Sequence, residues 1–189
     1  MSDLQRKKGR LQFFLIAALF FGPLLIAAWL YYGGEALQPQ ERANHGALLE
    51  PIVSLLDETP GSAIHDSRTW RLLYAERGEC GDACREALYT LRQARLMLGK
   101  EMDRVERVFL HGAEPPDTLL GAEEHQGLVA LHEPALHAVL DDKRPATLPA
   151  GGFFLIDPHG NLVLYFSPDI EPRDMVDDIK RLLKLSRIG

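Results

Sequence analysis

The sequence has no internal repeat, no low-complexity tract and no overall surplus of positive charge. Its formal net charge is −6, and the first 32 residues carry +3, which leaves −9 for the remainder. Proteins that bind nucleic acid need clustered Lys and Arg to neutralise phosphates, so this balance argues against a nucleic-acid partner. About 155 residues follow the first 32, which is enough for one domain with its own core.

Cysteine is scarce as well. The only two, Cys80 and Cys84, lie in the stretch ERGECGDACREALYTLRQARLMLG (residues 76–99), four positions apart at the start of a predicted helix. The bare spacing fits a structural disulfide, a redox-active pair and a metal-binding pair of thiols. The rest of the sequence has to decide among these three interpretations.

One long hydrophobic run is present, LQFFLIAALFFGPLLIAAWLYY (residues 11–32), with Gln12 as its one polar side chain. As a helix, 22 residues extend roughly 33 Å, which exceeds the ~30 Å hydrocarbon core of a bilayer. A cleaved signal peptide is the alternative, but its apolar region would be unusually long. We therefore predict a transmembrane anchor at residues 11–32.

The basic residues of the chain's first segment indicate the orientation of this anchor. Arg6, Lys7, Lys8 and Arg10 precede the apolar run, so residues 1–10 are expected to be a cytoplasmic basic tail. In a bacterial-type cell, the rest of the chain then lies on the periplasmic side of the inner membrane. Disulfides can persist in that compartment, so the two thiols have access to redox chemistry there.

The pattern after the anchor predicts a tether over residues 33–50 and one domain over residues 51–189. A strand that runs into a helix and then a second strand indicates a parallel pair with a crossover, and the closing hairpin adds antiparallel strands. With a dithiol at the first strand-to-helix turn, this order predicts an α/β, thioredoxin-like domain. The expected strands are 69–76, 103–111, 127–131, 151–157 and 161–167, and the expected helices run from the cysteines to Gly99, over 133–142, and from about 173.

The predicted helix start makes the two thiols suited to joint chemistry. Residues four apart on a helix have Cβ atoms about 5–6 Å apart, and the non-helical Cys80 can close the remaining gap to a disulfide. The same separation lets both sulfurs hold one copper(I) ion. A bridge that closes so short a loop removes little unfolded-state entropy, which favours a functional pair over a structural disulfide.

Three segments resemble the SCO/SenC family, membrane-anchored thioredoxin-fold proteins that help to assemble the copper centre of cytochrome c oxidase. LLYAERGECGDAC (residues 72–84) resembles the family's strand and Cys-x-x-x-Cys loop, and RVFLHGAEPPDT (107–118) its second strand and acidic loop. FFLIDPHGNLVLYFSPDIEPRDMVDDIKRLL (153–183) resembles its closing hairpin and helix. The resemblance implies that Cys80 and Cys84 cycle as a dithiol and bind copper.

The sequence departs from the family at two positions, and from related thioredoxin-like reductases at a third place. The family's third copper ligand is a histidine just ahead of the closing hairpin, where this chain has Pro149, and no histidine occurs between residues 138 and 158. Gly81 replaces the proline usual in the cysteine loop, and Gly151-Gly152 stands where related reductases carry a cis-proline. Two thiolates suit copper(I), whereas copper(II), which favours imidazole, should be held poorly.

Among the other histidines, His111 is the leading candidate for a third metal ligand, because it ends the second predicted strand near the cysteine loop. Any single histidine is more commonly a solvated or core residue than a metal ligand. Asp117 is expected to be a loop or cap residue. The remaining histidines are His45, His65, His125, His132, His137 and His159.

Three functions remain open. The first is an SCO-like assembly factor for cytochrome c oxidase, which acts by thiol-disulfide exchange or copper(I) carriage on oxidase subunits or other assembly factors. The second is a thiol-disulfide oxidoreductase with another periplasmic substrate. The third is a non-catalytic thioredoxin-fold scaffold with a structural disulfide. The reduction potential of the cysteine pair separates the third from the others.

Overall fold

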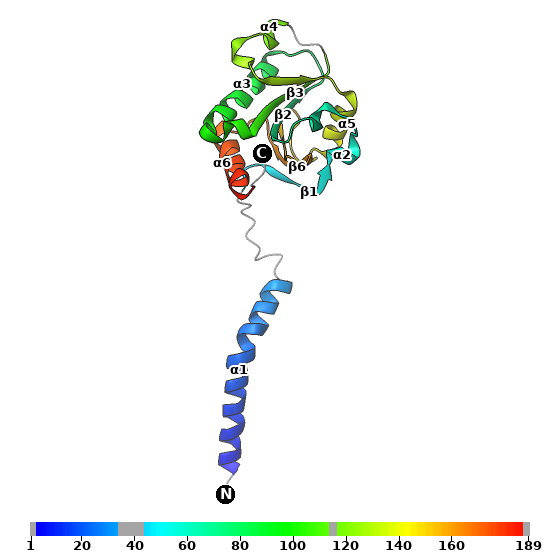
Figure 1. Ribbon diagram of the computed structural model, residues 1–189. Helices are drawn as coiled ribbons and strands as arrows, with labels where there is room; N and C mark the ends of the chain where they lie inside the picture. The colour runs from blue at the N-terminus through cyan, green and yellow to red at the C-terminus, as the bar shows by residue number, and fades with distance from the viewer. Residues whose placement is uncertain (1–2, 34–43, 114–116, 187–189) are drawn as a thin grey trace. The chain divides into compact units, whose positions relative to one another are not determined.

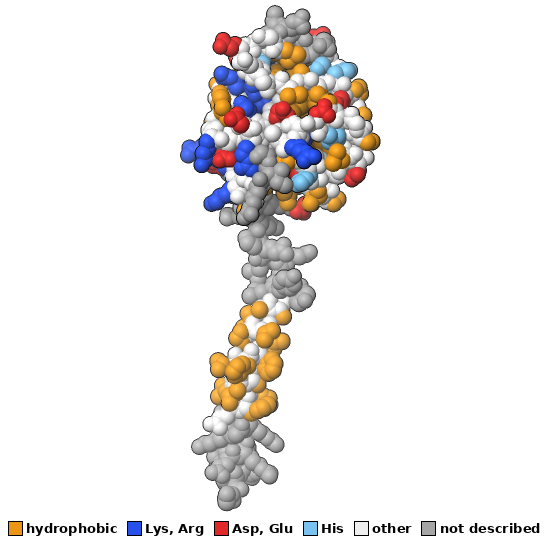
Figure 2. All heavy atoms as spheres, viewed as in Figure 1, with side chains coloured by type: hydrophobic (Ala, Val, Ile, Leu, Met, Phe, Trp, Pro, Cys, Tyr) orange, Lys and Arg blue, Asp and Glu red, His pale blue; other side chains and the backbone are white. Residues whose placement is uncertain are grey.

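The computed structural model describes residues 3–33, 44–113 and 117–186, and the chain forms two compact units, Met1–Ala43 and Asn44–Gly189. In the first unit, the predicted apolar segment lies within one helix, α1 (Asp3–Gly33). Its window Gln12–Trp29 has a mean hydropathy of 2.0, so the helix is long and apolar enough to cross a membrane. Hydrophobic side chains cover this window in Figure 2.

The second unit is built around one six-stranded mixed sheet with the strand order β1-β6-β5-β2-β3-β4. The strands are β1 (Ala47–Ser54), β2 (Trp70–Glu76), β3 (Val105–His111), β4 (Leu128–Leu131), β5 (Phe153–Ile156) and β6 (Asn161–Phe166). The helices are α2 (Leu55–Glu58), α3 (Asp82–Met97), α4 (Asp117–Leu120), α5 (Pro134–Lys143) and α6 (Pro172–Leu185). Short 3-10 turns add η1 (Ala63–His65), η2 (Gly99–Arg104) and η3 (Glu123–His125). Figure 1 shows this arrangement.

The strand pairing agrees with the sequence pattern. β2 and β3 are parallel, with Trp70 opposite Val105 and Glu76 opposite His111, and α3 is the crossover between them. β4 joins β3 in parallel, while β5 and β6 form the expected antiparallel hairpin. The mixed sheet and its helices therefore confirm the predicted α/β, thioredoxin-like fold.

Alternate residues of the strands divide the core into two layers. One cluster joins Leu72 and Tyr74 of β2 to buried residues of α3 and α6, including Leu91 and Ile179. The other joins Leu73 of β2 to the residues of α2 and α5 that pack on the opposite face. Because neighbouring strand residues point to opposite faces, a nearly continuous apolar strand such as β2 must lie in the centre of a sheet covered on both sides.

The boundary of the folded unit differs from the prediction. Residues 33–50 were expected to be a tether, but the folded unit begins at Asn44 and β1 begins at Ala47, where it pairs antiparallel with β6 at the edge of the sheet. Leu49 is the one fully buried side chain of this strand, and Pro51 lies inside it. An exposed edge strand that contains proline gives no alternating hydrophobic signal, which is why the pattern missed it.

The paired glycines before β5 are required by close packing. The Gly152 N–H donates to the Tyr165 hydroxyl over 3.0 Å, and that hydroxyl donates to the Pro149 carbonyl over 2.6 Å. A Cβ atom on Gly152 would lie 2.0 Å from the Phe166 carbonyl oxygen, which no side chain can tolerate without backbone movement. The place where related reductases carry a proline is therefore held here by a glycine and a tyrosine.

We expect Gly152→Ala to lower the free energy of unfolding by about 3 kcal/mol or more, because the new methyl group overlaps backbone atoms. Urea unfolding of the full chain in detergent micelles measures this. Gly78→Ala is the matched control, since its Cβ would meet only Glu76 Oε1 at 3.6 Å. Equal stabilities of the two variants would contradict the packing described for Gly152.

Candidate functional site

Cys80 and Cys84 form a disulfide at the amino end of α3. The strand β2 ends at Glu76, a short loop follows, and Gly81 is the residue that precedes the first helical position, Asp82. The Cα atoms of the two cysteines are 5.1 Å apart, within the usual range for a disulfide. The structure thus brings both predicted site residues together at the predicted place.

The two cysteines differ in their exposure. Cys84 is 1% exposed and belongs to the cluster that contains Tyr74 and Phe153, whereas Cys80 is half-buried and packs against the edge of the same cluster. An attacking thiolate from another molecule needs access to one sulfur of a disulfide. Cys80 is the more exposed of the two cysteines, so we expect an attacking thiolate to reach its sulfur and not that of Cys84.

The start of α3 supplies the electrostatics of the site. The amide groups in the first turn of a helix have no partners within the helix, and their partial positive charge favours a thiolate. Asp82 places a negative charge in the same turn, but Arg85 pairs with it over 2.9 Å at the surface. Asp82 opposes the formation of a thiolate, and Arg85 partly cancels that effect.

Tyr74 and Glu76 organise the loop before Cys80, and sequence reasoning missed both. The Tyr74 hydroxyl donates to Glu76 Oε2 over 3.2 Å, and Glu76 Oε1 accepts the Gly78 N–H over 2.9 Å. Burial, together with the negative charge of Glu76, raises the pKa of Tyr74 well above its usual range, so this phenol stays protonated. The signal in the sequence was a Tyr and a Glu two positions apart, which places them on the same face of a strand.

His111 does not join the two sulfurs in a metal site. It ends β3 opposite Glu76 and is 6% exposed, and its Nδ1 lies 3.2 Å from the Ala113 carbonyl oxygen. Across the described ranges, no group of three or more His, Cys, Asp or Glu side chains could hold a metal ion. His111 is therefore not grouped with the two cysteines in the part of the chain that the structure describes.

His111 instead belongs to a group of three histidines where β3 and β4 end. Its ring centre is 5.4 Å from that of His132, whose Nδ1 lies 3.0 Å from the His111 carbonyl oxygen. His137 of α5 is buried nearby, and burial, with the charge of Arg77 as a smaller cause, lowers its pKa. Arg77 itself pairs with Asp141 of α5, which links the loop before Cys80 to this helix.

The other predicted candidates lie elsewhere. Asp117 begins α4, and its side chain lies outside the described residues. His159 occupies the turn between β5 and β6, at the opposite end of β2 from the cysteines, as expected. His45 pairs with Asp174 at 3.7 Å, His65 contacts the Thr59 carbonyl oxygen at 3.1 Å, and His125 is buried beside Glu124.

Acid is expected to destabilise the folded unit through His125 and His137. Burial lowers the pKa of both imidazoles in the folded state, while an unfolded histidine has a pKa near 6.5. The folded state thus disfavours the charged ring. Stability is complete above about pH 6.5 and is lost as the pH falls from there through the lowered pKa values. Melting temperatures of the full chain between about pH 7.5 and 5 measure this loss.

Replacement of His137 by Gln, which cannot take up a proton in this range, should make the decline of the melting temperature with acid less steep. An unchanged slope would show that His137 does not contribute to it. Direct NMR titration of the imidazole provides a second check, with the folded-state pKa expected below 6.5.

Two models of protein families match the chain. Residues 70–186 match the transmembrane-like, thioredoxin-like, C-terminal domain, and residues 2–34 match the transmembrane-like, N-terminal domain. A comparison with curated proteins finds no significant match.

Solved structures with the same fold include SCO proteins, in line with the resemblance seen in the sequence. Yeast Sco1 is 18% identical, with 62% of this chain and 81% of that chain covered and a TM-score of 0.50. ScoI of Bradyrhizobium japonicum, solved with copper bound, is 22% identical over 60% of this chain and 84% of that one, with a TM-score of 0.45. The thioredoxin domain of a thiol-disulfide oxidoreductase from Bacteroides vulgatus is 12% identical, with 72% of this chain and 96% of that chain covered and a TM-score of 0.44.

Proposed function

The chain belongs to the family of transmembrane-like proteins with a thioredoxin-like C-terminal domain, and from this premise we propose that it is a membrane-anchored thiol-disulfide exchange protein. One observation supports this proposal above the others. The Cys80–Cys84 disulfide lies at the start of α3 and joins a half-buried cysteine, Cys80, to an enclosed one, Cys84. A disulfide with one approachable sulfur, beside a helix start that favours thiolate, is suited to exchange.

The exchange begins when a thiolate of a target protein attacks the sulfur of Cys80. A mixed disulfide forms, the bond between Cys80 and Cys84 breaks, and Cys84 leaves as a thiolate that takes up a proton. A second thiolate of the target then attacks the target's first sulfur, the one bonded to Cys80. This step forms the target disulfide and releases Cys80 as a thiolate. The target is oxidised by two electrons and this chain is reduced by two. The reverse sequence reduces a target disulfide.

In the reduced state, the same pair is suited to copper(I) as cargo. Two thiolates are the soft ligands that copper(I) selects, and a Cα separation of 5.1 Å lets both sulfurs approach one ion. The described residues supply no third His, Cys, Asp or Glu ligand beside them. A two-sulfur site without imidazole favours brief carriage and release of copper(I) and disfavours copper(II).

The target that we propose is a cysteine pair in a copper-binding subunit of cytochrome c oxidase, or in another assembly factor. The SCO/SenC resemblance supports this choice, with α1 as the anchor in a bacterial inner membrane, its basic end in the cytoplasm and the folded unit in the periplasm. The missing third ligand gives specific support to a second candidate. In that case the chain is a thiol-disulfide oxidoreductase for another periplasmic substrate and carries no copper.

A trapping experiment tests the exchange. Cys84→Ser should accumulate a mixed disulfide with a substrate that carries a disulfide, because the Cys80 thiolate attacks one substrate sulfur, the other leaves as a thiolate, and no Cys84 remains to release the mixed bond. Cys80→Ser should accumulate far less, since Cys84 is enclosed. Non-reducing gels after alkylation measure the difference, and equal trapping by both variants would contradict the assigned roles.

The reduction potential of the Cys80–Cys84 pair decides between exchange and a structural role. Structural disulfides of secreted proteins have potentials below about −300 mV, whereas exchanging pairs lie higher. Equilibration of the full chain with glutathione buffers measures this value. A pair that stays oxidised throughout the glutathione range would identify a structural disulfide and remove the exchange proposal.

Copper(I) titration of the reduced full chain, against a coloured copper(I) chelator, tests carriage. We expect near-stoichiometric binding that is lost in Cys80→Ser and in Cys84→Ser, and that weakens as the pH falls because protons compete for the thiolates. His111→Gln should bind as the original chain does. Unchanged binding in both cysteine variants would remove the copper proposal, and weaker binding in His111→Gln would restore this histidine as a ligand.

A further inference from the structure

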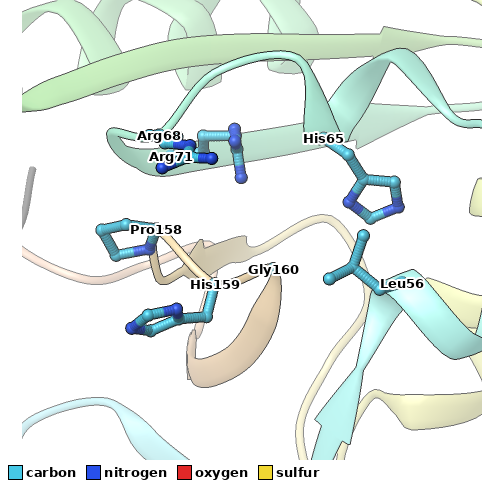
Figure 3. A pocket seen from close by; sticks show the side chains of 7 residues that line it. All are labelled: Leu56, His65, Arg68, Arg71, Pro158, His159 and Gly160. Carbon is cyan, nitrogen blue, oxygen red and sulfur yellow. The ribbon is translucent and has the colours of Figure 1, made fainter.

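A second candidate site lies at the other end of β2. A cavity of about 390 Å³ opens where this strand begins, and Figure 3 shows its lining. Arg68 and Arg71 lie on one side, across from the turn between β5 and β6 that carries Pro158 and His159. His65 of η1 lies toward the far end of the cavity. From Arg71 to Glu76 the strand extends roughly 17 Å, so this cavity is separate from the disulfide.

Arg71 is the unusual residue of this cavity. Its side chain is 2% exposed, yet its Nε and Nη1 have no hydrogen-bond partner among the described residues. A buried charged donor without a partner costs more free energy than almost any other polar group. A cavity beside such a guanidinium indicates that a ligand completes its hydrogen bonds.

The carboxylates that act on Arg71 lie outside the lining of the cavity. Burial lowers the pKa of Arg71, and the carboxylates of Glu106, Asp157 and Asp66 oppose that change from a distance. None of these three lines the cavity. The Asp157 carboxylate is engaged within its own turn, where it accepts hydrogen bonds from the His159 and Asn161 backbone amides and the Asn161 side chain.

The turn between β5 and β6 is fixed against the cavity. The Gly160 carbonyl accepts the Leu55 N–H over 2.9 Å, and Gly160 has a φ of 85°. A Cβ atom at this position would lie 3.3 Å from His65 Nδ1, so the turn and η1 pack closely only because the residue is glycine. The turn and η1, which both line the cavity, therefore lie in close contact with one another.

We propose that this cavity binds a phosphate group, carried by a small molecule or by a lipid headgroup. Arg71 would contact it at the buried end, Arg68 from the exposed side, and His159 from the facing turn. A planar carboxylate has two oxygens and one charge, which one guanidinium already satisfies. A phosphate monoester has three terminal oxygens and up to two charges, which match donors on facing walls. The volume leaves space for part of the attached organic group.

NMR titration of the full chain, in a detergent without phosphate groups, tests this proposal. The signal of the Arg71 Nε–H, identified by its loss in Arg71→Met, is followed as inorganic phosphate, glycerol 3-phosphate or acetate is added. We expect saturable shifts with the two phosphates and weaker binding of acetate. Arg68→Ala should weaken phosphate binding about tenfold or more, because one charge-assisted contact is lost.

Arg173→Ala, at an exposed position of α6, removes the same charge away from the cavity and should bind phosphate as the original chain does. A response to vesicles of phosphatidic acid, with none to the soluble phosphates, would support a lipid source of the same group. A cavity that holds only water would leave the Arg71 signal unmoved by every phosphate probe. That result, or phosphate binding unchanged in Arg68→Ala, would overturn the proposal even if Arg71→Met failed to fold.

Discussion

The central position of β2 is the constraint on which both candidate sites depend. This strand is hydrogen-bonded to β3 on one side and to β5 on the other, and all of its residues from Trp70 to Tyr74 are buried. Its path is therefore fixed over its whole length. Parallel pairing with β3 requires a crossover, so the chain must turn into α3 directly beyond Glu76. The disulfide lies in that turn, and the basic cavity lies where the same strand begins.

The enclosed position of Cys84 follows from the same arrangement. α3 packs its inner face on β2 and β3, and Cys84 lies on that face with Leu88 and Leu91. Cys80 precedes the helix and remains at the edge of the cluster. The difference between the sulfurs is thus set by the helix register, because a shift of one residue would turn the second cysteine away from the core. A disulfide that closes so short a loop adds little to the stability of the fold through chain entropy. Its position at the helix start therefore matters more than the stability that it contributes.

The sequence predicted elements whose side-chain pattern is strong. β2, α3, the β5–β6 hairpin and α6 were all recognised from apolar periodicity, and the cysteine pair was placed at the correct helix start. β1 was missed because only Leu49 of that strand is fully buried, and the start of the folded unit was therefore placed too late. An edge strand gains its stability from backbone pairing with β6, which leaves almost no trace in side-chain composition.

The parts that escaped prediction depend on segments far apart in the chain. From the sequence, Arg71 is an ordinary charged residue near the start of a strand, and only the fold shows it buried at a cavity that His159 lines from the facing side. The contact between His111 and His132 likewise needs β4 to lie beside β3. Spacing along the sequence could nominate His111 as a ligand, but it could not show that its neighbours are a carbonyl oxygen and another imidazole.

The buried carboxylate of Asp178 on α6 has a mechanical consequence. Its Oδ2 accepts the Gly46 N–H over 2.9 Å, just after the folded unit begins at Asn44, and Gly46 is itself packed too closely against Phe166 to carry a side chain. Two further contacts with α6 lie even earlier in the chain: the Arg181 guanidinium donates to Asn44 Oδ1 over 3.5 Å, and His45 lies 3.7 Å from the Asp174 carboxylate. The last helix therefore holds the start of the folded unit at three successive residues, Asn44, His45 and Gly46, before the outermost strand begins at Ala47.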